Sequence, residues 1–119
     1  MADMKTYTGG CHCGTVRYEV QTDLAFTATC NCSMCSKMGW IMTFVPASAF
    51  KLVSGEENLI DYQFNKMVIH HLFCKTCGIR SFGRGKDKEG NDTVAVNVRC
   101  LDDVDVSTLQ SQLFNGKDL

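Results

Sequence analysis

Hydrophobic and polar residues alternate along much of the chain, which is the pattern of β-strands with one buried face. The alternation is clearest at 16–20, where two valines and a tyrosine are separated by charged residues. Further segments rich in β-branched and aromatic residues are predicted as strands at 25–29, 39–45, 59–64, 67–73 and 93–98. Helical periodicity is scarce, so the pattern predicts an all-β fold built from antiparallel sheets.

Short turns and one loop are predicted between these strands. One helical turn is predicted at 46–50 and another at 105–110, with Asp105 or Ser107 as its N-cap. Residues 65–66, Asn and Lys, separate two alternating runs and therefore predict a hairpin turn. Glycine and charged residues dominate 83–92, which predicts a loop there.

The length of 119 residues fits one compact domain, and the sequence contains no repeat, linker or low-complexity tract, so a single domain over 1–119 is expected. The net charge is -1 without a basic run, which argues against nucleic-acid binding. No apolar run reaches the roughly 18 residues of a membrane span, and the polar amino terminus does not resemble a secretory signal. We therefore expect a cytoplasmic protein without a nucleic-acid or membrane partner.

Cysteine is the exception in an otherwise ordinary globular composition, with 8 residues in the chain. A reducing cytosol disfavours structural disulfides, so cysteines at short spacings indicate metal ligands first. They form three groups and one isolated residue: Cys11 and Cys13; Cys30, Cys32 and Cys35; Cys74 and Cys77; and Cys100.

The first and last groups together supply four sulfurs, the set that closes a tetrahedral zinc site. Cys11 and Cys13 would bind one side of the ion, and Cys74 and Cys77 the other, so the ion would join distant parts of the chain. A glycine follows each pair and permits a tight turn. The alternative is a buried apolar cysteine cluster or an accidental CxxC spacing.

The middle group, Cys30, Cys32 and Cys35, supplies three sulfurs to a second zinc ion, and three protein ligands are typical of a catalytic zinc. Three thiolates make the ion a weak Lewis acid but keep a fourth, external thiolate nucleophilic, which favours chemistry on a small thiol. The alternative is a second structural site completed by a further ligand, for which the sequence offers Cys100, His12, His70 and His71.

Three segments, at 9–18, 30–37 and 73–78, resemble the glutathione-dependent formaldehyde-activating enzyme family, which also includes centromere protein V. The resemblance spans nearly the whole chain and implies the β-tent fold, with sheets around a structural four-cysteine zinc site and one or two short helical turns. It implies the same two zinc ions and the same cysteine groups as the spacing, with Cys100 outside both ligand sets.

The family activity joins the thiol of glutathione to formaldehyde, so the resemblance implies a carbon-sulfur lyase of the S-(hydroxymethyl)glutathione synthase type. Its partners would be glutathione or another small thiol, and formaldehyde or a related small electrophile. Basic residues near the motifs are candidates for the glutathione carboxylates: Lys37, Arg80, Arg84 and Arg99. The alternative is a non-enzymatic, zinc-stabilised β-tent binding module. Nothing in the sequence indicates an oligomeric state.

Overall fold

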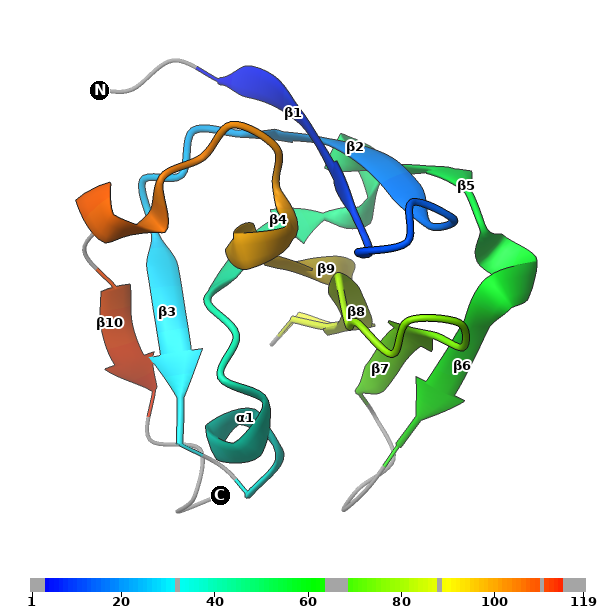
Figure 1. Ribbon diagram of the computed structural model, residues 1–119. Helices are drawn as coiled ribbons and strands as arrows, with labels where there is room; N and C mark the ends of the chain where they lie inside the picture. The colour runs from blue at the N-terminus through cyan, green and yellow to red at the C-terminus, as the bar shows by residue number, and fades with distance from the viewer. Residues whose placement is uncertain (1–3, 32, 64–68, 88, 110, 115–119) are drawn as a thin grey trace.

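The protein, described here from a computed structural model at residues 4–31, 33–63, 69–87, 89–109 and 111–114, is built from two β-sheets (Figure 1). The three-stranded sheet contains, in spatial order, β1 (Lys5–Gly10), β2 (Arg17–Thr22) and β5 (Phe50–Ser54). The seven-stranded sheet contains β10 (Ser111–Phe114), β3 (Thr27–Cys30), β4 (Met42–Pro46), β9 (Asp92–Asn97), β8 (Phe82–Lys86), β7 (His70–Cys74) and β6 (Leu59–Tyr62). The predicted β class is confirmed.

Helical structure is confined to short pieces. These are the helix α1 (Ser33–Met38) and the 3-10 turns η1 (Ala47–Ala49), η2 (Glu56–Asn58), η3 (Val98–Cys100) and η4 (Val106–Thr108). The turns η1 and η4 lie where helical turns were predicted, and the side chain of Asp105 caps η4 by accepting the N–H of Ser107. The short helix α1 was not predicted. The expected hairpin turn at 65–66 lies outside the described residues.

The hydrophobic core lies between the two sheets. Tyr18 of β2 and Phe82 of β8 pack edge to face, with ring centroids 5.7 Å apart. The ring centroid of Phe50 in β5 lies 4.7 Å from that of Phe82. Val20 of β2 and the alternating Val94 and Val96 of β9 fill the same space, and all three are fully buried. The period of two in the sequence therefore identifies the inner face of each sheet correctly.

One strand pair differs from the expected antiparallel sheets. The last described strand, β10, runs parallel to β3 at the edge of the larger sheet, with Ser111 opposite Thr27. The hydroxyl groups of these two residues lie 2.9 Å apart. The pair is parallel because the chain returns from β9 through a long connection that contains η3 and η4. Such a connection can bring a strand back in either direction, unlike a tight hairpin.

The loop predicted at 83–92 is wrong in its first half, because residues up to Lys86 belong to β8. Glycine suggested a loop, but Gly83 is needed for a different reason. A Cβ atom at this position would lie 2.9 Å from the backbone oxygen of His70, so only glycine allows β7 to pack this closely.

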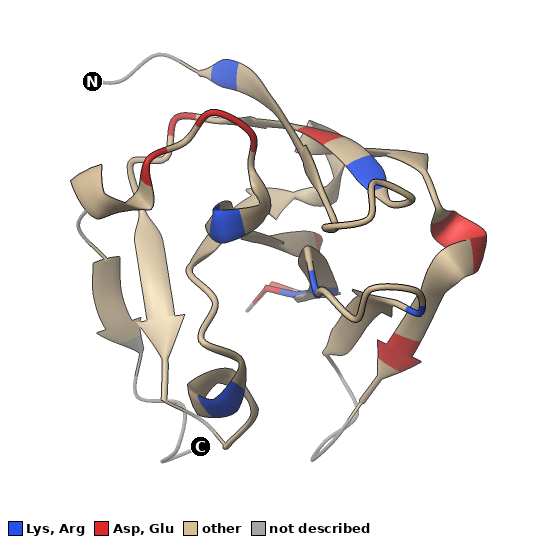
Figure 2. Cartoon of the chain, viewed as in Figure 1, with Lys and Arg blue, Asp and Glu red and all other residues tan. Residues whose placement is uncertain are grey.

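Figure 2 shows Lys and Arg spread over several elements, while acidic positions follow one another along the loop between η3 and η4, which is orange in Figure 1. Among the described residues, no helix has the length and hydropathy needed to cross a membrane.

Candidate functional site

Four cysteines from distant parts of the chain meet between the two sheets. The Sγ atoms of Cys11, Cys13, Cys74 and Cys77 all lie within 4.8 Å of one another. Cys13 lies 3.6 Å from Cys11 and 3.7 Å from Cys74, measured between sulfurs. A disulfide would require about 2.05 Å. Zinc–sulfur bonds of about 2.3 Å in a tetrahedron place the sulfurs about 3.8 Å apart, so the cluster fits one zinc ion.

The local structure explains how these sulfurs converge. Cys11 and Cys13 lie in the turn between β1 and β2, while Cys74 ends β7 and Cys77 lies in the turn that follows. Both turns are closed by a glycine whose N–H donates back to the first cysteine of its pair, and Gly78 has a φ of 78°. That left-handed backbone is accessible to glycine without strain. The cluster consequently ties the smaller sheet to the larger one.

N–H groups surround the cluster sulfurs. The backbone N–H of Val16 donates to Cys11 at 3.3 Å, and the side-chain amide of Asn58 donates to Cys74 at 3.2 Å. Hydrogen bonds led by the backbone N–H of Cys77 lower the pKa of the Cys74 thiol to about 6. Burial, in contrast, raises the pKa of Cys11. The donors favour thiolates at part of the cluster, and a cation is the natural partner of that charge.

The middle cysteine group is only partly described. Cys30 ends β3 and Cys35 lies in α1, and both pack in a small hydrophobic cluster with Trp40 and Met42. The indole N–H of Trp40 donates to the Cys35 sulfur at 3.2 Å. Cys32 lies outside the described residues, so the predicted three-cysteine zinc site stays a prediction. Within the described part of the chain, Cys11, Cys13, Cys74, Cys77 and Cys100 are free thiols.

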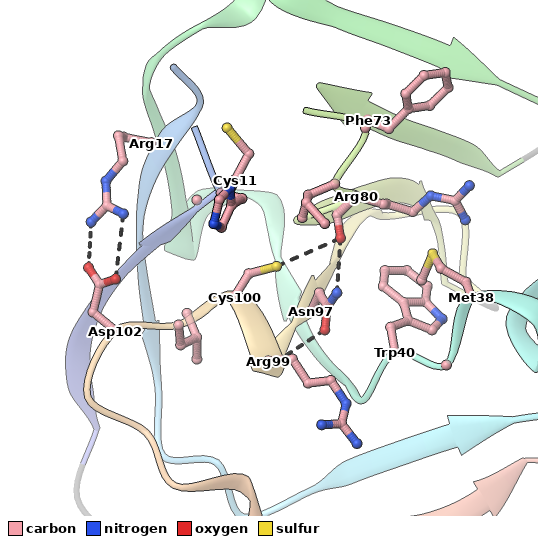
Figure 3. Close-up of a pocket in the computed structure, with 16 residues that line it drawn as sticks. Cys11, Arg17, Met38, Trp40, Phe73, Arg80, Asn97, Arg99, Cys100 and Asp102 are labelled. Atoms are coloured by element: carbon pink, nitrogen blue, oxygen red, sulfur yellow. Dashed lines mark hydrogen bonds and ion pairs between the residues drawn. The ribbon is translucent and has the colours of Figure 1, made fainter. Parts of the chain in front are cut away.

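A pocket of about 750 Å³ lies between the four-cysteine cluster and the segment after α1 (Figure 3). Its described lining combines residues from both sheets and from the connections: Gly10, Cys11, His12, Arg17, Met38, Gly39, Trp40, Phe73, Gly78, Ile79, Arg80, Asn97, Arg99, Cys100, Leu101 and Asp102. The volume is within the about 300–1,000 Å³ typical of small-molecule sites.

Basic groups outnumber acidic ones in this lining. The lining contains three arginines, Arg17, Arg80 and Arg99. Its single carboxylate is that of Asp102, which is hydrogen bonded to Arg17 and accepts the Thr8 hydroxyl at 2.7 Å. The bond from Arg17 holds the pKa of Asp102 below its ordinary value. Arg99 is exposed, and its side chain forms no ion pair within the described part of the chain. The pocket is therefore suited to an anionic ligand.

Arg80 organises one side of the pocket. Its side chain is 7% exposed, and its Nη1 lies 2.8 Å from Nδ1 of the buried His71. Burial, and then the charge of Arg80, lower the pKa of His71 to about 4. A neutral His71 accepts the arginine proton at Nδ1 and carries its own proton on Nε2. Arg80, one of the candidates named from the sequence, thus lies beside the pocket in a fixed position.

Cys100 and Asn97 both point at the backbone oxygen of Arg80 in Figure 3, with the thiol 3.9 Å and the amide nitrogen 2.9 Å away. Burial raises the pKa of Cys100 to about 11, so its sulfur remains a neutral thiol at neutral pH. Within the described residues, Cys100 lies outside the four-sulfur cluster.

The sequence matches the model of the family described as glutathione-dependent formaldehyde-activating enzyme over residues 6–117. The chain belongs to this family. The predicted family resemblance is therefore confirmed, and the family name supports a general role in glutathione-dependent formaldehyde activation. A crystal structure of a Rhodobacter sphaeroides protein from a structural genomics project is also similar. It has 33% sequence identity and a TM-score of 0.80, over 90% of this chain and 99% of that one.

Sequence reasoning placed some residues of this family member's pocket and missed others. Of the basic candidates, Arg80 and Arg99 line it, whereas Arg84 lies over the rings of Phe50 and Phe82 and is not among the lining residues. Lys37 is exposed on α1. Arg17, Asn97 and Asp102 were missed, because their meeting depends on the pairing of β1 and β2 with the later chain. Their positions inside or beside the family motifs were the only available signal.

Proposed function

We propose that this protein binds glutathione in the pocket beside Trp40 and adds its thiol to formaldehyde, forming S-(hydroxymethyl)glutathione. The observation that carries the proposal is the pocket itself, whose lining provides Arg17, Arg80 and Arg99 with one carboxylate, Asp102. Glutathione has two carboxylates and one ammonium group, and arginine binds carboxylates through paired N–H groups. The family match supports both substrates.

Two zinc ions are part of this proposal. The four-cysteine cluster has the donor chemistry and the sulfur spacing of a structural zinc site. For the second ion we propose Cys30, Cys32 and Cys35, supported by the packing of Cys30 and Cys35 in one cluster and by a hydrogen-bond donor directed at the Cys35 sulfur. A zinc ion there would supply positive charge that favours the thiolate form of a bound thiol.

The contribution of the chain's own residues is mainly positioning. Arg99 is exposed at the pocket and can bind a carboxylate, while Trp40 and Phe73 provide apolar walls for the peptide backbone. The sulfur would then approach the formaldehyde carbon as a C–S bond forms. The electron pair of the C=O double bond moves to oxygen, which takes up the proton lost by the thiol. Holding both reactants in one pocket supplies the rate advantage.

The location that we propose is the cytoplasm, as expected from the sequence. Four cysteine sulfurs are spaced as the ligands of one metal ion, and a reducing compartment keeps such ligands from forming disulfides.

The decisive experiment measures the rate of S-(hydroxymethyl)glutathione formation by exchange NMR, with zinc-loaded protein and with the spontaneous reaction as reference. We expect acceleration by the wild type, loss of acceleration in Cys35→Ser, and retention in Arg84→Ala, whose side chain lies over Phe50 and Phe82 and is not among the lining residues. Glutathione binding without any acceleration would contradict the enzyme proposal and favour the alternative of a zinc-stabilised binding module.

A further inference from the structure

Trp40 takes part in two sites at once. Its ring lines the pocket, and its indole N–H donates to the Sγ atom of Cys35 over 3.2 Å. The indole nitrogen can only donate, so the sulfur is the acceptor in this contact. Trp40 is 4% exposed and Cys35 is 7% exposed. Little water therefore competes for either partner, and the hydrogen bond is retained in a low-dielectric environment.

The indole ring is held in one orientation by groups from the larger sheet. The guanidinium carbon of Arg80 lies 6.0 Å from the ring centroid, and the ring of His71 lies 6.4 Å away. On β8, a Cβ atom at Gly83 would lie 3.6 Å from the far edge of the indole, so the ring rests over that glycine. Figure 3 shows Trp40 on the same side of the pocket as Arg80 and Met38.

The backbone brings Trp40 back onto the helix that contains Cys35. The N–H of Gly39 donates to the Cys35 oxygen over 2.8 Å, and the chain reverses at Gly39, whose φ is 75°. The same helix has a second contact with the pocket lining. The Nη2 atom of Arg80, a lining residue, lies 3.9 Å from the sulfur of Met34 in α1. The segment with Cys35 is thus attached to the pocket wall.

We propose that Trp40 is a positioning residue that links the pocket to Cys35. A ligand in the pocket contacts the indole ring, and the same ring holds Cys35 through its N–H. Groups that hydrogen bond to a metal ligand fix its orientation and affect metal affinity. Ligand in the pocket and metal on Cys35 therefore change each other's affinity by the same factor, because such coupling is reciprocal. This inference rests on the proposed function, since it takes Cys35 as a zinc ligand.

The chain contains one tryptophan, which permits a clean test. Global replacement of tryptophan by benzothienylalanine, whose ring has sulfur in place of the N–H, alters Trp40 alone and nearly preserves its shape. Zinc affinity is measured by competition with a chromophoric chelator. We expect one of two zinc ions to bind about 10-fold more weakly. The other ion, on the four-cysteine cluster, is expected to bind as in the wild type and reports that the fold is intact.

The second measurement tests the link itself. Adding glutathione is expected to change the affinity of the weaker zinc ion in the wild type and to have a much smaller effect in the benzothienyl protein. Phe73→Leu is the control, because Phe73 lines the pocket from β7, whereas Cys35 lies in α1. It should weaken glutathione binding and leave zinc affinity without glutathione unchanged.

The outcomes separate this inference from the proposed function. If the wild type binds two zinc ions and glutathione, but the benzothienyl protein has the same zinc affinity and the same coupling, the role of Trp40 is wrong and the proposed function stands. If the wild type binds only one zinc ion, or no glutathione, the proposed function fails and the link fails with it.

Discussion

The sulfur atoms of Cys13 and Cys74 lie 3.7 Å apart although 61 residues separate them in the sequence. The contact joins the turn after β1 to the end of β7, and therefore one sheet to the other. A hydrophobic core also connects the sheets, through pairs such as Tyr18 and Phe82. The two connections differ in kind, because the cluster could hold a metal ion, whereas the core is held by hydrophobic packing.

Loss of the cluster is expected to destabilise the whole fold. In Cys74→Ser, or after zinc is removed by a chelator, we expect the thermal midpoint to fall by roughly 10 °C or more, because binding free energy at a structural zinc site contributes directly to folding. Differential scanning calorimetry measures the shift. The control is Cys100→Ser, which removes a thiol outside the cluster. Equal midpoints for the two variants would show that the cluster is not a structural metal site.

A backbone prediction concerns Gly55, which precedes η2 and has a φ of 90°. A Cβ atom here would lie 2.5 Å from the backbone oxygen of Thr15, so Gly55→Ala combines left-handed strain with a clash. We expect a loss of about 3 kcal/mol in the free energy of unfolding, measured with urea. Gly90→Ala is the matched control, because its φ is 84° but no atom lies within 4 Å of the added carbon. It should cost about 1–2 kcal/mol.

The arginines of the pocket should differ in importance for ligand binding. Arg99→Ala is expected to weaken glutathione binding about 10-fold, because a charged hydrogen bond to a carboxylate is lost. Calorimetric titration at low salt measures the change, and added salt should reduce the difference between variant and wild type. Arg84→Ala removes the same group from a position over Phe50 and Phe82, outside the pocket lining, and should leave the affinity unchanged. Equal losses in both variants would contradict a specific role for Arg99.

His71 should make the fold sensitive to mild acid. Burial lowers its pKa to about 4 in the folded protein, from an ordinary value of 6.5, so below pH 6.5 the unfolded chain takes up a proton that the folded protein excludes. The contribution of neutral His71 to the free energy of unfolding is therefore present above pH 6.5 and is lost as the pH falls towards 4. At pH 5 the loss is about 2 kcal/mol.

The measurement for His71 is urea unfolding of the wild type and of His71→Asn between pH 7.5 and 5. Asparagine retains an acceptor for Arg80 but does not titrate, whereas protonation of cysteine ligands affects both proteins alike. The wild-type curve should fall more steeply than the curve of the variant. Parallel curves would mean that His71 becomes protonated in the folded protein and that burial does not keep it neutral.

Much of the fold was predictable because each central strand has an alternating hydrophobic pattern within its own short segment of sequence. In β9, Val94 and Val96 alternate with smaller or polar residues, and both are completely buried. Strands defined by distant partners were harder to predict. The short strand β10 depends on pairing with β3, and β8 contains Gly83, which allows close packing against β7. The helix α1 is too short for helical periodicity to appear in its sequence.

The candidate site also has a part that could be predicted from the sequence, the four-cysteine cluster, and a part that could not, the pocket. Spacing alone grouped Cys11 and Cys13 with the later pair, because two cysteines on one turn can reach the same ion. The pocket could not be assembled from the sequence, since Arg17, Asn97 and Asp102 come from β2, β9 and the connection after η3. Only the packing of the two sheets brings their side chains together.

The distance along the chain between the two halves of the four-cysteine cluster has a consequence for biosynthesis. Chains are made from the amino terminus at about 5–20 residues per second, so Cys11 and Cys13 emerge several seconds before Cys74. During that interval the first pair has only two sulfurs to offer, and its hairpin lacks the sheet on which it packs. Zinc delivery is therefore expected to be a late step of maturation, and a shortage of zinc should leave newly made chains exposed to proteolysis.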